Sequence, residues 1–257
     1  MQIFRALFFP SRKSIFRRRY HPWISLNLKT NWPVFGRNNI IQLHREALQH
    51  IQSLPRDVVS NKPIQLPVLI GEFGIPYDLN NGIGFKTGDF SSHEEALSSY
   101  YAIFDLLGFS STQWNYSVEN SNVYGDNWNL ENLSIFSREQ QLDSNNIHSG
   151  GRAIRGFSRP YAPFVCGVRI STKFDAKTKH FMLKYLPFRE NSNLGNPLTC
   201  TIVYLPNMQY QENEVKFTIK VRNGTYVMQK LATHHYIYVW SISEAVIDPI
   251  SITISKP

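Results

Sequence analysis

In the first half of the chain, segments with hydrophobic residues at helical spacing alternate with short hydrophobic segments typical of strands. Residues 38–54 carry hydrophobic side chains at helical spacing and end at Pro55, which predicts an amphipathic helix. The short hydrophobic run Pro67-Val68-Leu69-Ile70 then predicts a buried strand. A polar, glycine-rich loop is expected over residues 78–89.

A second helix and a second strand follow. Ser91 and Glu94 form a capping-box pattern that opens a helix over residues 91–107, and Gly108 ends it. Residues 109–116 have the β-branched and aromatic content of a strand. The order helix, strand, helix, strand is typical of a parallel α/β sheet.

From about residue 151 the pattern changes to short alternating runs without helices between them. Asn223-Gly224 predicts a hairpin turn, and residues 175–178 predict another. The expected strands cover residues 165–174, 181–186, 199–205, 215–221, 225–231, 235–240 and 251–255. Strands in this number without helices predict an antiparallel β-sandwich domain. The polar residues 140–150 are the expected linker, so the sandwich domain is predicted over residues 151–257.

Charge is distributed unevenly along the chain. With 257 residues, 42% of them hydrophobic, the chain is long enough to bury a substantial core. Residues 1–40 contain eight Lys and Arg and no acidic residue, whereas the remainder has 19 basic and 19 acidic residues. The net charge of +8 therefore does not indicate a basic groove on the folded part, and nucleic acid is not an expected partner.

Residues 1–21 form a basic N-terminal arm that is expected to be disordered. The mixture of hydrophobic and cationic residues is typical of a transit peptide or a membrane-surface segment, and Pro10 interrupts any helix. A mispredicted start of the coding sequence explains the arm equally well. An intracellular location, cytoplasmic or membrane-associated, is expected, with mitochondrial targeting by the arm as a weaker alternative.

Cys166 and Cys200 are the only cysteines, and they do not form a paired metal-binding motif. Buried thiols are expected, and neither a metal nor another cofactor is predicted. The adjacent His234 and His235 point to opposite faces of a strand, which also argues against a metal site.

Glu72 is the first candidate for chemistry. It follows the hydrophobic run directly, in Gly71-Glu72-Phe73-Gly74, where a buried strand meets solvent. Reactive groups in (β/α) barrels lie at the carboxyl ends of such strands. Taken alone, Glu72 is better explained by a structural role at a strand end.

Aromatic and polar residues at the end of the second strand are candidates for ligand binding. Trp114 ends that strand and is placed to stack on the C–H face of a sugar, although a strand Trp is more often in the core. The loop of residues 124–132 is rich in hydrogen-bonding groups and contains Trp128, which suits a polyhydroxylated ligand. A tight structural turn explains that loop nearly as well.

An ordered series of motifs resembles glycoside hydrolase family five, in its endoglycoceramidase-like group with fungal glucosylceramidases and sterylglucosidases. The motifs are Pro22-Trp23-Ile24-Ser25-Leu26-Asn27, Pro33-Val34-Phe35-Gly36, Leu69-Ile70-Gly71-Glu72-Phe73-Gly74-Ile75-Pro76-Tyr77-Asp78, Trp114-Asn115-Tyr116, Gly125-Asp126-Asn127-Trp128-Asn129, Leu133-Ser134 and Arg152-Ala153-Ile154-Arg155-Gly156-Phe157-Ser158-Arg159-Pro160-Tyr161-Ala162. The resemblance runs from about residue 22 to the C-terminus.

The resemblance implies an α/β plus all-β fold. Residues 22–139 are expected to form the last two β/α units of an incomplete (β/α)8 TIM barrel, followed by the antiparallel β-sandwich. It implies that Glu72 is the nucleophile and Trp114 the floor of a sugar subsite, with further substrate-binding residues Tyr77, Asn115, Asp126 and Trp128. The implied substrate is a glycolipid, such as a glucosylceramide or a steryl glucoside, and contact with a membrane surface fits such a substrate.

The chain departs from the family pattern in one respect that concerns catalysis. The family carries its general acid/base in an Asn-Glu-Pro motif, which does not occur here. Glu119, Asp126 and Glu131 are conceivable substitutes. We expect the C-terminal part of a retaining β-glucosidase that is weakly active or inactive as an isolated chain. Its exposed sheet edges and apolar surface should make the segment misfold or bind a partner.

Two alternatives remain at this stage. The chain is either such an enzyme part or a non-catalytic glycan- or lipid-binding protein derived from it. A third option is membrane or nucleic-acid association through the basic arm. The oligomeric state is left open.

Overall fold

The computed structural model describes residues 2–5, 24–27, 30–55, 57, 59–62, 66–128, 131–188, 199–210, 217–242 and 248–256. The chain divides into two compact units, Met1–Phe157 and Ser158–Pro257. The boundary lies a few residues later than the predicted one at residue 151. Most of the predicted linker at 140–150 is described as turns and bends within the first unit.

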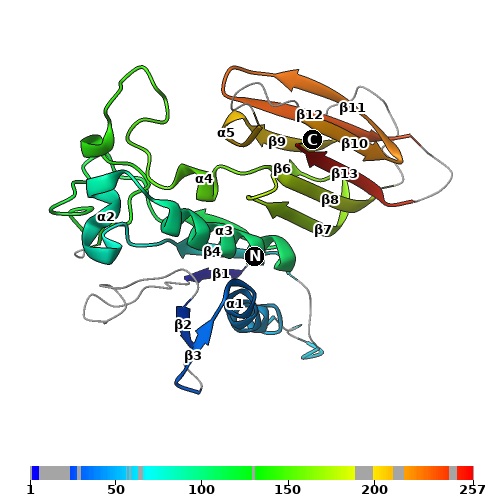
Figure 1. Cartoon of the computed structure of the whole chain (residues 1–257). Helices are drawn as coiled ribbons and strands as arrows, with labels where there is room; N and C mark the ends of the chain where they lie inside the picture. The colour runs from blue at the N-terminus through cyan, green and yellow to red at the C-terminus, as the bar shows by residue number, and fades with distance from the viewer. Residues whose placement is uncertain are drawn as a thin grey trace. The chain divides into compact units, whose positions relative to one another are not determined.

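A three-stranded parallel sheet with helices on one face forms the centre of the first unit (Figure 1). The strand order is β1-β4-β5. The elements of this unit are β1 (Gln2–Arg5), β2 (Ile24–Asn27), β3 (Trp32–Phe35), α1 (Arg37–Gln52), β4 (Val68–Phe73), α2 (Leu79–Thr87), α3 (Ser91–Leu107), β5 (Ser110–Gln113), a 3-10 turn (Arg138–Gln140) and α4 (Ile154–Phe157). β2 and β3 form a separate antiparallel pair.

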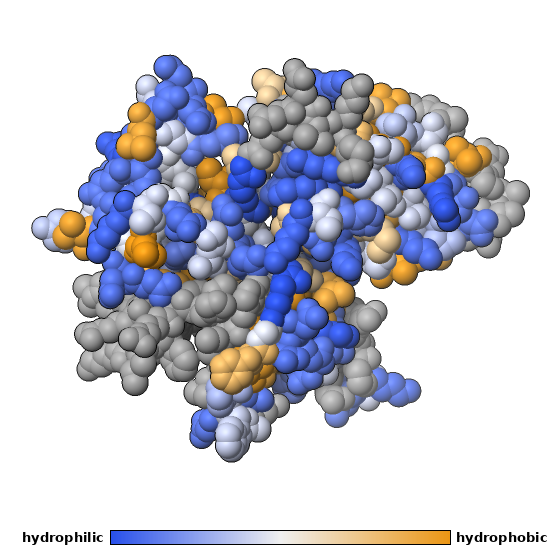
Figure 2. All heavy atoms as spheres, viewed as in Figure 1, coloured by the Kyte–Doolittle hydropathy of each residue, from blue (hydrophilic) through white to orange (hydrophobic). Residues whose placement is uncertain are grey.

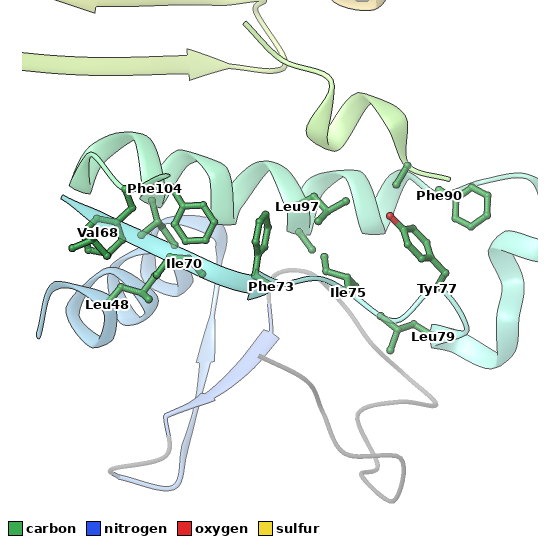
Figure 3. Packing of buried hydrophobic residues seen from close by; sticks show 14 residues of the cluster. Leu48, Val68, Ile70, Phe73, Ile75, Tyr77, Leu79, Phe90, Leu97 and Phe104 are labelled. Atoms are coloured by element: carbon green, nitrogen blue, oxygen red, sulfur yellow. The ribbon is translucent and has the colours of Figure 1, made fainter. Parts of the chain in front are cut away.

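The core of the first unit lies between the sheet and helices α1 and α3. Phe73 of β4 contacts Tyr101 and Phe104 of α3 edge to face, at ring-centroid distances of 5.2 and 4.9 Å. Leu48 of α1 joins the same buried cluster, and Figure 3 shows Leu48, Phe73 and Phe104 gathered between strand and helices. The two helices therefore cover the same face of the sheet.

Several predicted elements of this unit are confirmed, and others need correction. The helices predicted over 38–54 and 91–107 are α1 and α3. The capping box is wrong: Ser91 is the first helical residue, and its N–H donates to the Asp89 carboxylate at 2.8 Å. The predicted loop at 78–89 contains α2, which is interrupted by left-handed backbone at residues 80–82. The strand predicted over 109–116 ends at Gln113, so Trp114 lies just beyond it.

The N-terminal arm contributes one strand. Residues 2–5 form β1, which pairs in parallel with β4 on the side opposite β5. β4 therefore has two neighbours, where the sequence led us to expect one. The rest of the predicted arm lies outside the described residues.

Two four-stranded antiparallel sheets form the second unit. Their strand orders are β10-β13-β8-β7 and β11-β12-β9-β6. The elements are β6 (Tyr161–Phe164), β7 (Gly167–Asp175), β8 (His180–Pro187), β9 (Thr201–Pro206), α5 (Asn207–Tyr210), β10 (Thr218–Arg222), β11 (Gly224–Lys230), β12 (His234–Ser241) and β13 (Ile250–Ser255). One buried cluster takes residues from both sheets, so the predicted sandwich is confirmed.

The two predicted turns of this unit have different outcomes. Residues 175–178 join β7 to β8, and the Asp175 carboxylate accepts the N–H groups of Lys177 and Thr178. The hairpin at Asn223-Gly224 is wrong, because β10 and β11 belong to different sheets. Asn223 has a positive φ of 59°, as hairpin turns require, but here it carries the chain from one sheet to the other.

Hydrophobic residues are exposed in both units among polar ones. Figure 2 shows them in orange between hydrophilic residues on the side in view. No helix among the described residues is long and apolar enough to cross a membrane.

Candidate active site

A β-bulge in β4 sets the direction of the Glu72 side chain. On one side of β4, Phe4 pairs with Ile70 and Arg5 with Glu72, so Gly71 has no partner. On the other side, Ser111 pairs with Ile70 and Gln113 with Phe73, which again leaves one extra residue on β4. The Thr112 hydroxyl donates to the carbonyl of Gly71. Both neighbouring strands therefore locate the extra residue next to Glu72.

The bulge exchanges the faces that Glu72 and Phe73 would otherwise occupy. In a regular strand, Glu72 would share the core face with Val68 and Ile70, because alternate residues point the same way. One inserted residue reverses this alternation and returns Phe73 to the core, where it is 1% exposed. Glu72 is thereby turned to the face that α1 and α3 do not cover, and it is partly exposed there.

Trp114 lies on the same face as Glu72. Gln113, its neighbour, points toward α3 and accepts a hydrogen bond from the Tyr101 hydroxyl at 3.0 Å. Trp114 therefore points to the opposite side, together with the exposed Thr112. The structure brings these two predicted site residues to one face, at the carboxyl ends of adjacent parallel strands.

The main chain around Trp114 is held close to β4. The Trp114 N–H donates to the Phe73 carbonyl at 2.8 Å, and the Trp114–Asn115 peptide bond is cis. A side chain at Gly74 would overlap the Trp114 carbonyl oxygen, so glycine permits this approach. The Trp114 indole N–H donates to Oε2 of Glu131 at 3.2 Å, which places the Glu131 carboxylate beside the indole.

Asp126 organises the loop that follows β5. Its carboxylate is 8% exposed and accepts four hydrogen bonds from within the first unit. The donors are the side-chain amides of Asn115 (3.2 Å) and Asn120 (2.6 Å) and the backbone N–H groups of Leu133 (2.8 Å) and Ser134 (3.2 Å). These contacts use the acceptor capacity of Asp126 for the fold of the loop.

Arg152 also stabilises this loop, through hydrogen bonds from its guanidinium. It is fully buried, and its guanidinium donates to Gln140 at 2.9 Å, to Asn132 at 2.8 Å and to Asn122 at 2.9 Å. Burial lowers the pKa of Arg152 to about 10, and the guanidinium lies 4.7 Å from the centre of the Phe85 ring. The side-chain oxygens of these three residues thus accept hydrogen bonds from one buried cation.

Tyr77 lies in the core beneath this network. It is 0% exposed, its hydroxyl donates to the Arg152 carbonyl at 3.3 Å, and its ring stacks on His93 at 5.3 Å. Burial raises the pKa of Tyr77 and lowers that of His93 to about 4. Both groups are therefore uncharged near neutral pH.

The remaining predicted residues differ in their surroundings. Trp128 is 63% exposed, and its carbonyl accepts a hydrogen bond from the Glu131 N–H at 2.9 Å. Asn115 contacts Asp126 and lies at the base of the loop. Glu72, Trp114 and Trp128 are thus exposed enough for a ligand to reach them. Tyr77 and Asp126 are buried and form hydrogen bonds to other residues of the first unit. The roles of all these residues toward a substrate remain predictions.

Sequence reasoning gave no role to three residues of this region. Arg152 appeared only as part of a motif, and Glu131 only as a conceivable acid. His93 carried no signal, because a histidine inside an amphipathic helix looks like any other polar position. The described residues contain no group of His, Cys, Asp and Glu arranged to hold a metal ion.

Comparison with known proteins finds a family-model match in the second unit. Residues 159–254 match the model of the glycoside hydrolase family 5 C-terminal domain. The resemblance to glycoside hydrolase family five read from the sequence is thereby confirmed, and the relatives support it.

The relatives are fungal glycolipid glucosidases. The chain is 28% identical to a glucosylceramidase of Rhizopus delemar over 214 residues, which are 78% of this chain and 30% of that protein. It is 34% identical to the ergosteryl-beta-glucosidase of Saccharomyces cerevisiae over 108 residues, 42% of this chain and 14% of that protein. The chain thus spans less than a third of the length of these curated relatives.

Solved structures share the fold. Cryptococcus neoformans sterylglucosidase 1 superimposes with a TM-score of 0.75 at 22% identity, over 92% of this chain and 36% of that chain. Endo-glycoceramidase II from Rhodococcus sp. gives a TM-score of 0.52 at 12% identity, over 84% of this chain and 36% of that chain.

Proposed function

We propose that the chain is the C-terminal part of a retaining β-glucosidase that acts on glycolipids such as glucosylceramide or a steryl glucoside. In this proposal the first unit supplies the last two β/α units of an incomplete (β/α)8 barrel. Parallel β4 and β5, with helices on one face and Glu72 and Trp114 together on the other, support that assignment, because barrels carry their reactive groups at the carboxyl ends of strands.

Glu72 is the nucleophile in this proposal. Its carboxylate oxygen forms a bond to the anomeric carbon while the bond to the aglycone oxygen breaks, and Trp114 holds the sugar ring by stacking on its C–H face. The bulge at Gly71 is the observation that carries the proposal most directly, since bulges that redirect a side chain are common beside active sites.

A second carboxylate at ~5 Å is needed to protonate the leaving oxygen and later to activate water. No Asn-Glu-Pro motif supplies it, and Asp126 is committed to four internal donors. Glu131 is the carboxylate that contacts Trp114. Acid/base assistance contributes ~10² to 10⁴ in rate, so we propose that the isolated chain turns over slowly or not at all.

A fluoroglucoside with a fluoride leaving group tests the nucleophile separately from the acid. Fluoride leaves without protonation, so 2-deoxy-2-fluoro-β-glucosyl fluoride requires only the attack by Glu72. We expect a covalent fluoroglucosyl adduct on the peptide containing Glu72, detected by mass spectrometry, and no adduct in Glu72→Gln. Glu119→Gln, which changes an exposed carboxylate in the loop after β5, is the matched control. An adduct elsewhere, or equal labelling of Glu72→Gln, would refute the proposed nucleophile.

The second candidate is a non-catalytic glycan- or lipid-binding protein. The exposed Trp128 on a loop braced by Asp126 and Arg152 favours it, because a rigid loop presents an aromatic ring at little entropic cost. It predicts glycolipid binding that survives Glu72→Gln, with no glucose released at any protein concentration.

An intracellular location, in the cytoplasm or at a membrane, belongs to the proposal as well. A fluorescent protein fused to the C-terminus tests it. Secretion of the fusion into the medium would contradict this part.

A further inference from the structure

The outward face of the β11-β12-β9-β6 sheet carries two uncharged rows of side chains that run across all four strands. Alternate residues of β9 and β12, including Val203, Leu205, Ile237 and Val239, point into the sandwich core. Their neighbours point outward. By the strand register, one outward row is Gln229, Tyr236, Tyr204 and Tyr161, and the next is Val227, Tyr238, Ile202 and Phe164.

We call this surface the aromatic face and define it by Tyr161, Phe164, Tyr204, Tyr236 and Tyr238. Tyr161 is 49% and Phe164 46% exposed, and the other three are partly exposed. Burial raises the pKa of Tyr161 and of Tyr204, so their hydroxyls remain protonated at neutral pH. Neither row contains Lys, Arg, Asp or Glu. Exposed apolar surfaces of this kind generally mark interaction sites.

The rings do not form a flat platform. The planes of Tyr161 and Tyr204 are inclined at 44°, those of Tyr204 and Tyr236 at 62°, and those of Tyr236 and Tyr238 at 51°. The ring centroids are 5.3 to 6.4 Å apart, so the rings shield one another. An extended sugar chain lying on a sheet needs coplanar exposed ring faces, which this surface does not offer.

The opposite outer face of the sandwich has a different character. The rows of the β10-β13-β8-β7 sheet contain Lys173, Lys184, Lys220 and Arg222, together with Ser, Thr and Met. All four cationic side chains are exposed. One face of the unit is therefore suited to anions, and the aromatic face is suited to a partner without net charge.

We propose that the aromatic face attaches the protein to the surface of a zwitterionic phospholipid bilayer. Tyrosine suits the interface of a bilayer because its ring is apolar and its hydroxyl polar. The two rows lack Lys, Arg, Asp and Glu and so avoid the desolvation cost that such charges would impose there. The imidazole of His234 is in ring contact with Tyr204 and Tyr236 at the border of the aromatic face. The inference takes from the proposed function only the lipid class of the substrate, which in a membrane would have to be met at the bilayer surface.

Sedimentation with vesicles of pure phosphatidylcholine tests the attachment. These vesicles contain no glycoside, so the result does not depend on Glu72 or on hydrolysis. We expect the chain to bind them, with a partition coefficient that changes little between low and high salt because no ion pair is involved. The double variant Tyr161→Ser/Phe164→Ser, on an edge strand, should bind at least tenfold more weakly.

Two further variants separate a binding effect from a folding defect. Val227→Glu introduces a charge at a position that is 60% exposed, removes little packing, and should also weaken binding. Lys184→Ser, on the opposite outer face, is the matched control and should bind like the wild type. Thermal melting of each variant verifies that the second unit is folded.

A fluorescence measurement gives the depth of contact. Phe164→Trp should gain fluorescence quenching by brominated phosphatidylcholine that Lys184→Trp does not gain. The proposal is overturned if the wild type does not bind neutral vesicles, or if binding requires anionic lipid and is lost in Lys184→Ser. It is also overturned if Val227→Glu binds like the wild type, or if the aromatic-face variants abolish self-association and leave vesicle binding unchanged.

Discussion

Replacing Asp126 by Asn should destabilise the first unit without any ligand present. Oδ1 of Asp126 accepts from Asn120 and from the Ser134 N–H, and Oδ2 accepts from Asn115 and from the Leu133 N–H. An amide in place of the carboxylate retains the shape but turns an NH2 group toward two of these donors. Two hydrogen bonds are then lost, and the donors are left buried.

The magnitude follows from the number of donors. Each buried donor without an acceptor costs about 1 to 3 kcal/mol, so the loss of two acceptors in Asp126→Asn should lower the free energy of unfolding of the first unit by about 2 to 6 kcal/mol. Asp126→Ala leaves all four donors without this acceptor and should cost more, although water admitted to the smaller side chain's space offsets part of the loss.

Hydrogen exchange of individual amides is the most direct assay. The Leu133 and Ser134 N–H groups donate to Asp126, so their exchange should accelerate in both variants, and urea unfolding followed by Trp fluorescence should give the change in stability. Glu119→Gln is the control, because Glu119 is exposed in the same loop. If Asp126→Asn unfolds within ~0.5 kcal/mol of the wild type and weakens only glycolipid binding, Asp126 is a substrate ligand and our account of the loop is incorrect.

Three other perturbations test separate features. Gly74→Ala should cost about 1 to 3 kcal/mol, because the added methyl overlaps the Trp114 carbonyl. A larger loss of melting temperature than in Gly88→Ala would verify it, because at Gly88 the methyl meets open space and only the positive φ of 73° opposes it. The pKa of His93 is lowered from 6.5 to about 4, so the unfolded state binds more protons as pH falls from 6.5 to 4, and stability should fall in that window by up to about 3 kcal/mol. His93→Phe should lessen this pH dependence of melting, and an unchanged pH profile would contradict the buried neutral imidazole. Glu131→Leu removes the acceptor of the Trp114 indole N–H, so the indole proton resonance of Trp114 should move upfield in a ¹⁵N-correlated spectrum; Glu131→Gln, which retains an oxygen acceptor, should show a smaller change.

The sequence predicted those parts of the fold that depend on local periodicity. Helices α1 and α3 and seven strands of the second unit follow from hydrophobic spacing and from breakers such as Pro55 and Gly108. The Asn223-Gly224 turn failed because a dipeptide specifies local backbone angles and does not specify which sheet receives the next strand.

Other features depend on pairing between distant segments. The bulge at Gly71 exists only relative to β1 and β5, so no pattern within residues 67–74 reveals which way Glu72 points. The internal role of Asp126 is equally invisible, because two of its donors are backbone N–H groups that any residue would supply. Counting charges also concealed an asymmetry: Ser158–Pro257 has 12 Lys and Arg against six Asp and Glu, although residues 41–257 together are neutral.

The loop after β5 separates the residues that hold it from those that it displays. Asp126 and Arg152 secure it through buried contacts, whereas Val123, Tyr124 and Trp128 project from its turns with exposures of 78%, 74% and 63%. Substitutions at these projecting positions would leave the anchorage intact. Under the proposed function, exchanging the tips of this loop would therefore change ligand preference at little risk to folding.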